Sequence, residues 1–167
     1  MRNIPFSPPD IREEDIQEVV DALRSGWITT GPRTKTFEAK IAEYCGTNRA
    51  VCLNSATAGM ELILRLLGIG KGDEVITSAY TYTASASVIE HVGAKIVLVD
   101  TALESYEMDL NKLEEAITEK TKAIIAVDLA GVICNYEAIF KLVESKKNLF
   151  KANNEIQDKI GRITVIA

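Results

Sequence analysis

Short apolar runs alternate with longer segments of helical periodicity along most of this chain. The apolar runs lie at residues 50–53, 74–77, 96–99, 123–127 and 163–167. Between them, apolar side chains recur every three or four residues, which is the spacing of one helical face. Strands that alternate with helices in this way are typical of a mostly parallel sheet. We therefore predict an α/β fold in which helices cover both faces of the sheet.

Two further helices are expected before this alternation begins. Asp10 and Glu13 have the spacing of a capping box at the start of the first, and Gly26 follows its end. Its apolar face is formed by Ile16, Val19, Val20 and Leu23. Phe37, Ile41 and Tyr44 mark a second short helix that ends at Gly46. We expect residues 1–48 to form an N-terminal helical segment and residues 49–167 to form the α/β domain.

Composition and charge exclude several classes of protein. Hydrophobic residues make up 47% and charged residues 26% of the 167 residues, which disfavours both disorder and a coiled coil. The net charge is −5, and the sequence has no Lys/Arg cluster that would attract a nucleic acid. The longest apolar stretches are cut by Lys122 and Asp128, so no membrane span is predicted. The N-terminus has no apolar signal-peptide core. Three separated cysteines and one histidine offer no zinc site, so we expect a reduced, cytoplasmic protein without a metal.

The last apolar run ends at Ile166 and Ala167, with no turn or helix after it. In open α/β sheets, the residues that contact ligands lie just beyond the carboxyl ends of the strands. We therefore expect this chain to be the N-terminal part of a larger protein.

The strongest candidate site is a run of small residues at 54–59, Asn-Ser-Ala-Thr-Ala-Gly, which joins an apolar run to a helix. Small side chains let an anion approach the backbone, and a helix start offers free N–H groups. A phosphate site is one interpretation, with donors at the Thr57 and Ala58 amides. An ordinary helix cap is the other, because Ser55 and Thr57 are common capping residues. Composition and spacing alone do not decide between them. The helix that follows is apolar nearly all round, so we expect it to be buried.

Three other positions carry possible chemistry. Tyr80 and Tyr82 follow the run at 74–77 and could stack on a planar ring or simply pack. Asp128 places a carboxylate at the same edge of the predicted sheet.

The glycine-rich segment 68–73 precedes a strand, on the wrong side of the sheet for a nucleotide loop, so we predict a helix stop and turn there. The polar stretch 145–159 is expected to be a surface excursion.

Taken together, these residues resemble the DegT/DnrJ/EryC1/StrS family of nucleotide-sugar aminotransferases, which depend on pyridoxal 5'-phosphate (PLP). The matching pieces include Gly-Trp-Ile-Thr-Thr-Gly-Pro at 26–32, Asn-Ser-Ala-Thr-Ala-Gly at 54–59 and Gly-Asp-Glu-Val-Ile-Thr at 72–77. The resemblance implies the large domain of a fold-type I PLP enzyme, truncated at residue 167. It also implies that Ala56, Thr57 and Ala58 contact the cofactor phosphate and that Tyr82 stacks on the pyridine ring. Thr29 and Thr30 would lie in a loop that faces the substrate.

The resemblance also implies two residues that this chain does not contain. In the family, an Asp that pairs with the pyridine nitrogen follows the strand that here ends at Ala167, and the Schiff-base Lys lies further on. We therefore expect no catalytic residue within this chain, and we expect the chain alone to be inactive.

The implied activity of the whole enzyme is transfer of an amino group from an amino acid, usually glutamate, to a keto-sugar carried on a nucleotide. The product would feed surface polysaccharide or antibiotic-sugar synthesis, and the enzyme would be a homodimer. Two alternatives stay open: a PLP-dependent sugar dehydratase of the same family, and a noncatalytic α/β binding module.

Overall fold

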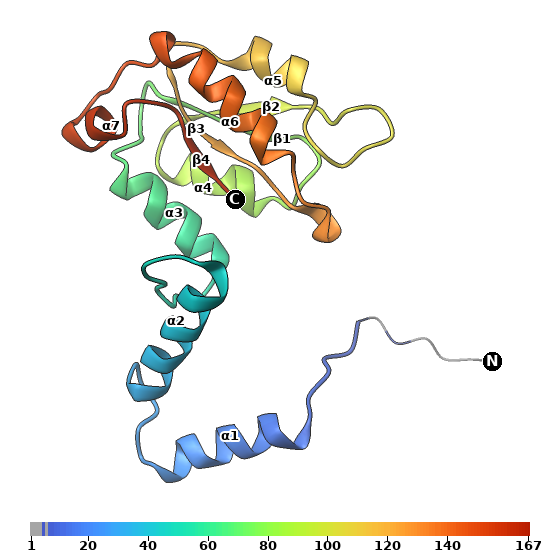
Figure 1. Ribbon diagram of the computed structural model, residues 1–167, viewed down its shortest axis with the longest axis vertical. Helices are drawn as coiled ribbons and strands as arrows, with labels where there is room; N and C mark the ends of the chain where they lie inside the picture. Colours follow the sequence, from blue (N-terminus) through green and yellow to red (C-terminus); the bar gives the residue numbers. More distant parts are fainter. Residues whose placement is uncertain (1–4, 6) are drawn as a thin grey trace. The chain divides into compact units, whose positions relative to one another are not determined.

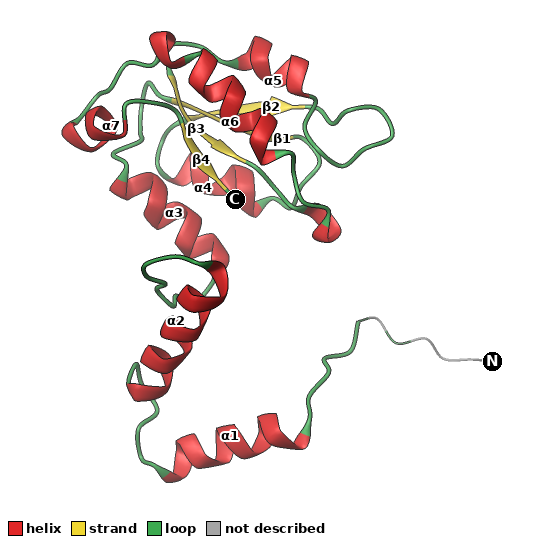
Figure 2. Cartoon of the chain, viewed as in Figure 1, coloured by secondary structure: helices red, strands yellow, loops and turns green. Residues whose placement is uncertain are grey.

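The computed structural model describes residue 5 and residues 7–167, and it divides into two units after Cys52 (Figures 1 and 2). The first unit contains the helices α1 (Glu13–Arg24) and α2 (Pro32–Cys45). Asp10 was predicted to cap α1, and this is wrong. Arg12 is the N-cap, and its N–H donates to the Asp15 carboxylate at 2.9 Å. The capping interaction therefore forms two residues later than the sequence pattern indicates.

The turn between the two helices depends on a close approach of a tryptophan ring to a glycine. The Trp27 indole N–H donates to the Thr30 carbonyl at 3.1 Å. A Cβ added at Gly31 would clash with the Trp27 indole. A larger residue at position 31 would therefore displace this ring from its hydrogen bond to Thr30. Pro32 then starts α2 with a backbone angle that already suits a helix.

The second unit is a four-stranded parallel sheet with the strand order β2-β1-β3-β4. Its strands are β1 (Glu74–Ser78), β2 (Lys95–Val99), β3 (Thr121–Ile125) and β4 (Thr164–Ile166). Successive side chains of a strand point to opposite faces. On β1, Val75 therefore packs in one core and Ile76 in the other. The predicted α/β fold, with a mostly parallel sheet, is confirmed.

Helices cover both faces of this sheet (Figure 1). The helices α3 (Ala56–Leu66) and α4 (Ala84–His91) pack on one face through Leu64, Val88 and Ile89. The helices α5 (Leu110–Ala116) and α6 (Tyr136–Ser145) pack on the other through Leu113, Ile139 and Val143. Three short elements complete the unit: η1 (Leu129–Gly131), η2 (Lys147–Leu149) and α7 (Glu155–Ile160).

Two sequence predictions about strands and burial are wrong. Residues 50–53 form no strand, and Val51 and Leu53 are exposed, because no neighbouring strand pairs with them in the described chain. Helix α3 is not buried all round. Leu64 is fully buried, whereas Leu66 is 62% exposed, because α3 packs on the sheet and α4 with one side only.

The polar stretch 145–159 is more than a surface excursion. Gln157 on α7 is buried, and its side-chain amide donates to the Leu67 carbonyl at 2.9 Å. Asn154 donates to the same carbonyl at 3.0 Å. These two amides fasten α7 to the end of α3. The segment 68–73 is the predicted helix stop and turn, with Gly68 and Gly72 at positive φ.

No helix in the part of the chain that the structure describes is long and apolar enough to cross a membrane. Within the same residues, no group of three or more His, Cys, Asp or Glu side chains could hold a metal ion.

Candidate functional site

The carboxyl edge of the sheet gathers the candidate residues of the second unit. All four strands are parallel, so Ser78, Val99, Ile125 and Ile166 end at one edge. Helix α3 precedes β1 and α4 follows it, so both helices begin at this edge. The contact between Glu61 of α3 and His91 at the end of α4, 2.9 Å from Oε2 to Nδ1, fits two helices that run in the same direction. The starts of α3 and α4 therefore face the same side of the sheet.

Ser55 caps the start of α3. Its hydroxyl oxygen accepts a hydrogen bond from the Ala58 N–H at 3.1 Å, and its backbone is extended, with φ −161° and ψ 156°. The cap interpretation of this loop is therefore correct for the Ala58 amide. Among the described residues, the Ala56 and Thr57 N–H groups donate to no protein acceptor. These two amides, together with the positive end of the helix dipole, remain available to an anion.

The side chains around these amides are small enough for a phosphate to approach. Residues 54–59 contain nothing larger than Asn54, and a Cβ added at Gly59 would meet only Leu53, at 3.4 Å. The positive helix end would attract a phosphate dianion. The Ala56 and Thr57 amides and the Ser55 hydroxyl could donate hydrogen bonds to it. The residues present fit the phosphate group of PLP. The contacts predicted for Ala56, Thr57 and Ala58 themselves stay a prediction.

Tyr82 lies in the loop that leads from β1 into α4. Its side chain is 80% exposed, and its carbonyl accepts a hydrogen bond from the Ser85 N–H at 3.2 Å. The ring is thus free to contact a planar ligand, while the backbone beneath it is fixed to the first turn of α4. Tyr80, two residues earlier, stacks on Tyr106 with the ring centroids 5.9 Å apart. Tyr80 therefore packs against another side chain of the protein. The stacking role predicted for Tyr82 stays a prediction.

Asp128, just past the end of β3, holds the loop that leads to α6. Its Oδ1 atom accepts from the Cys134 N–H and from the Tyr136 hydroxyl, both at 2.9 Å. The backbone hydrogen bond from Cys134 is the main cause that lowers the pKa of Asp128. This carboxylate is therefore ionised at neutral pH and engaged in shaping the loop.

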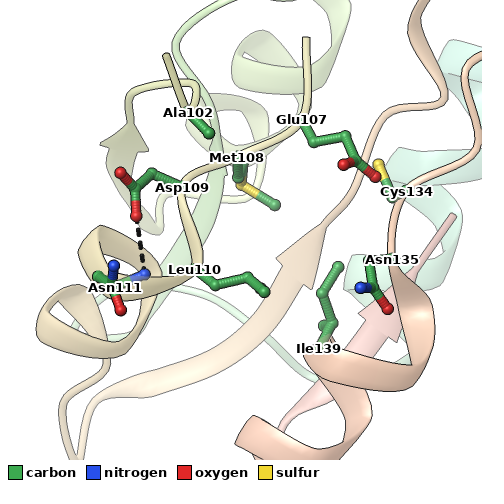
Figure 3. A pocket seen from close by; sticks show the side chains of 9 residues that line it. All are labelled: Ala102, Glu107, Met108, Asp109, Leu110, Asn111, Cys134, Asn135 and Ile139. Atoms are coloured by element: carbon green, nitrogen blue, oxygen red, sulfur yellow. Dashed lines mark hydrogen bonds between the residues drawn. The ribbon is translucent and has the colours of Figure 1, made fainter. Parts of the chain in front are cut away.

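A cavity of about 300 Å³ lies between the loop after β2 and the start of α6 (Figure 3). Met108, Leu110, Cys134 and Ile139 give it an apolar floor, while Glu107, Asp109, Asn111 and Asn135 bring polar groups. The Asp109 carboxylate caps the start of α5, where it accepts a hydrogen bond from the Asn111 N–H at 2.8 Å. Sequence reasoning missed this cavity because its walls come from two loops that share no motif.

Thr29 and Thr30 belong to the first unit. There, Ser25, Trp27, Thr29, Gly31, Pro32 and Arg33 line a cavity of about 310 Å³. The Thr30 carbonyl is held by the Trp27 indole, as described above. The substrate-facing role of these two threonines stays a prediction.

Comparison with known proteins extends this picture. The profile of the DegT/DnrJ/EryC1/StrS aminotransferase family matches residues 9–150. A UDP-4-amino-4-deoxy-L-arabinose–oxoglutarate aminotransferase from Shewanella sediminis is 46% identical over 144 residues, which are 86% of this chain and 37% of that protein. The chain thus spans little more than a third of the length of this relative.

Solved structures with the same fold include the Streptococcus pneumoniae protein Spr1654, assigned as a sugar aminotransferase. Its form with pyridoxamine 5'-phosphate (PMP) matches with a TM-score of 0.95 and 58% identity, over 98% of this chain and 41% of that one. The same protein is known in a PLP form. A GDP-4-keto-6-deoxymannose-3-dehydratase with bound GDP-perosamine matches with a TM-score of 0.79 and 27% identity, over 84% of this chain and 38% of that one.

Proposed function

The chain belongs to the DegT/DnrJ/EryC1/StrS aminotransferase family, and from this premise we propose that it forms the phosphate- and ring-binding part of a PLP-dependent sugar aminotransferase. The whole enzyme would transfer an amino group from an amino acid, glutamate by resemblance to the family, to a keto-sugar carried on a nucleotide. It would act as a cytoplasmic homodimer. The observation that carries the proposal is the start of α3, where the Ala56 and Thr57 amides have no protein acceptor among the described residues. When bound, PLP supplies the electron sink that amino transfer requires.

Within this proposal, the residues of the chain bind and orient the cofactor and the substrate. The amides of Ala56 and Thr57 bind the phosphate, and the Ser55 hydroxyl, whose oxygen accepts from the Ala58 N–H, donates its own hydrogen to the phosphate. Tyr82 stacks on the pyridine ring from the loop after β1. Thr29 and Thr30 contact the substrate. No group in the chain carries out the chemical step.

A second function, a sugar dehydratase, is supported by one observation. The dehydratase with bound GDP-perosamine shares the fold at 27% identity. Both proposals use the same phosphate and ring contacts, so experiments on these contacts test what the two have in common.

We expect the chain to bind PMP more tightly than pyridoxamine, which lacks the phosphate. PMP is the suitable probe because it has no aldehyde that could react with surface lysines. Ala56→Pro removes one donor at the first helical position, where proline is well tolerated after an extended Ser55. The change should weaken PMP binding by about 1–3 kcal/mol, the order of a hydrogen bond to a charged group, and should leave pyridoxamine binding unchanged. Dissociation constants can be measured by NMR titration of the chain.

Glu155→Pro is the matched control for this experiment. It places proline at the first position of α7, where Asn154 has the same extended backbone as Ser55. It should not change PMP binding. If Ala56→Pro folds and binds PMP as tightly as the parent chain, the start of α3 is a helix cap and not a phosphate site.

We further expect that PLP forms no specific covalent adduct with this chain. Among the described lysines, burial lowers the pKa of Lys122, which favours the neutral amine that a Schiff base requires. However, Lys122 lies near the start of β3, at the opposite edge of the sheet from Tyr82, and its amine donates to the Glu119 and Lys151 carbonyls. Borohydride reduction followed by peptide mass mapping should therefore find no stoichiometric label. One fully labelled lysine would contradict the assignment of the catalytic lysine to a part of the enzyme outside this chain.

A further inference from the structure

Two loops at the carboxyl edge of the sheet meet through a pair of aromatic rings. Tyr80 lies in the loop after β1, and Tyr106 lies in the loop after the neighbouring strand β2. Their ring centroids are 5.9 Å apart and the ring planes differ by 21°, which is an offset-stacked arrangement. Both rings remain about half exposed. Burial in a core therefore does not account for this pairing.

The loop that carries Tyr106 is held in place by backbone hydrogen bonds at its base. An antiparallel bridge joins Thr101 to Met108, and the Ala102 N–H donates to the Glu107 carbonyl at 3.0 Å. The Asp109 N–H closes the base of the loop by donating to the Asp100 carbonyl at 3.0 Å. The side chain of Met108 is buried in the core beneath. Tyr106 thus projects from a hairpin that is anchored to the sheet.

The loop that carries Tyr80 and Tyr82 is fixed at its two ends. The Ala79 N–H donates to the Val99 carbonyl at 2.8 Å, and the Tyr82 carbonyl accepts from Ser85 at 3.2 Å. Between these points, the Tyr80 N–H donates to the Ser78 hydroxyl at 3.1 Å, and the Thr81 and Ser85 hydroxyls lie 3.1 Å apart. These contacts hold the loop to β1 and to α4, whereas the stack of Tyr80 on Tyr106 joins it to the loop after β2.

We propose that Tyr106 is a positioning residue for the cofactor ring. By stacking on Tyr80, it holds the loop 79–83 in the conformation from which Tyr82 presents its face to the pyridine ring. This inference rests on the proposed function, because it takes the stacking role of Tyr82 as given. Tyr106 itself touches neither cofactor nor substrate in this proposal.

The test measures PMP binding to variants of the chain by NMR titration. Tyr106→Ala should weaken binding about two- to tenfold, the range that corresponds to a lost aromatic pair. Tyr106→Phe should bind as the parent chain does, because the ring and not the hydroxyl makes the stack. Tyr106→Leu keeps apolar bulk without an aromatic ring and should resemble the alanine variant. Tyr44→Ala, a change at an exposed tyrosine on α2, is the control and should have no effect.

A double-mutant cycle separates positioning from a general structural effect. In a Tyr82→Ala background, Tyr106→Ala should cause no further loss, because the ring that it positions is gone. An equal loss in both backgrounds, or parent-like binding by Tyr106→Leu, would overturn the positioning role. If Tyr82→Ala weakens binding and Tyr106→Ala does not, the inference is wrong and the proposed function stands. If Tyr82→Ala binds PMP as the parent chain does, the ring contact is misassigned and the inference falls with it.

Discussion

Leu64→Ala is expected to lower the free energy of unfolding of the chain by about 2–5 kcal/mol, the usual cost of a cavity left by a buried leucine. Leu64 has no exposed surface and packs in the core that α3 and α4 share with the sheet. It is the residue of α3 that is wholly buried, so its loss should loosen the helix whose first turn forms the proposed phosphate site. Urea denaturation followed by circular dichroism measures the change.

Leu66→Ala, on the same helix, is the matched control. Its side chain is largely exposed in this chain, so the change should stay within about 0.5 kcal/mol, as at most surface positions. Equal losses from the two variants would show that both faces of α3 are packed in solution. The one-sided burial described above would then be wrong.

The helices and the central strands follow from the pattern of the sequence, because a helix buries one face and a central strand of this sheet buries both. All five residues of β1 and of β3 are buried, and their apolar residues stand next to one another instead of alternating with polar ones, since both faces of these strands are covered. The salt bridge of Glu61 with Arg65, 2.7 Å from Oε1 to Nη2, follows in the same way from the spacing of four residues on a helix. Such features depend on neighbours that are close in the sequence, so a single chain can reveal them.

Features that depend on distant partners were not predictable in this way. A strand at 50–53 needs a neighbouring strand, and the apolar pattern cannot say whether one is present. The burial of Gln157 depends on the Leu67 carbonyl, 90 residues earlier in the chain. The same holds for the site. The small residues at 54–59 indicate a place where an anion can approach, but only the folded loops reveal that the Tyr80 ring is paired with Tyr106 and the Tyr82 ring is exposed.

Raising the pH through the range 9–11 is expected to destabilise the chain through Cys134. Its side chain is 5% exposed and its thiol donates to the Val127 carbonyl at 3.2 Å. Burial, followed by the nearby Asp128 carboxylate, raises the pKa of Cys134 to about 11. In the unfolded chain, a thiol ionises near pH 8.5. Over this range the unfolded state therefore loses its proton while the folded state keeps it, so the stability that is present below pH 8.5 is lost as the pH rises towards 11.

Cys134→Ser isolates this contribution, because a serine hydroxyl can still donate to the Val127 carbonyl but does not titrate in this range. The difference in free energy of unfolding between the parent chain and Cys134→Ser should fall by about 2–3 kcal/mol between pH 8 and pH 11, at 1.36 kcal/mol for each unit of pKa shift. Cys45→Ser, at an exposed thiol, serves as the control and should leave the pH dependence unchanged. The shape of the loop between β3 and α6 depends on the same groups, since Asp128 accepts from the Cys134 N–H. If the difference does not change with pH, or if iodoacetamide modifies Cys134 as fast as Cys45 at pH 9, the thiol is not buried in solution and the loop is more open than described.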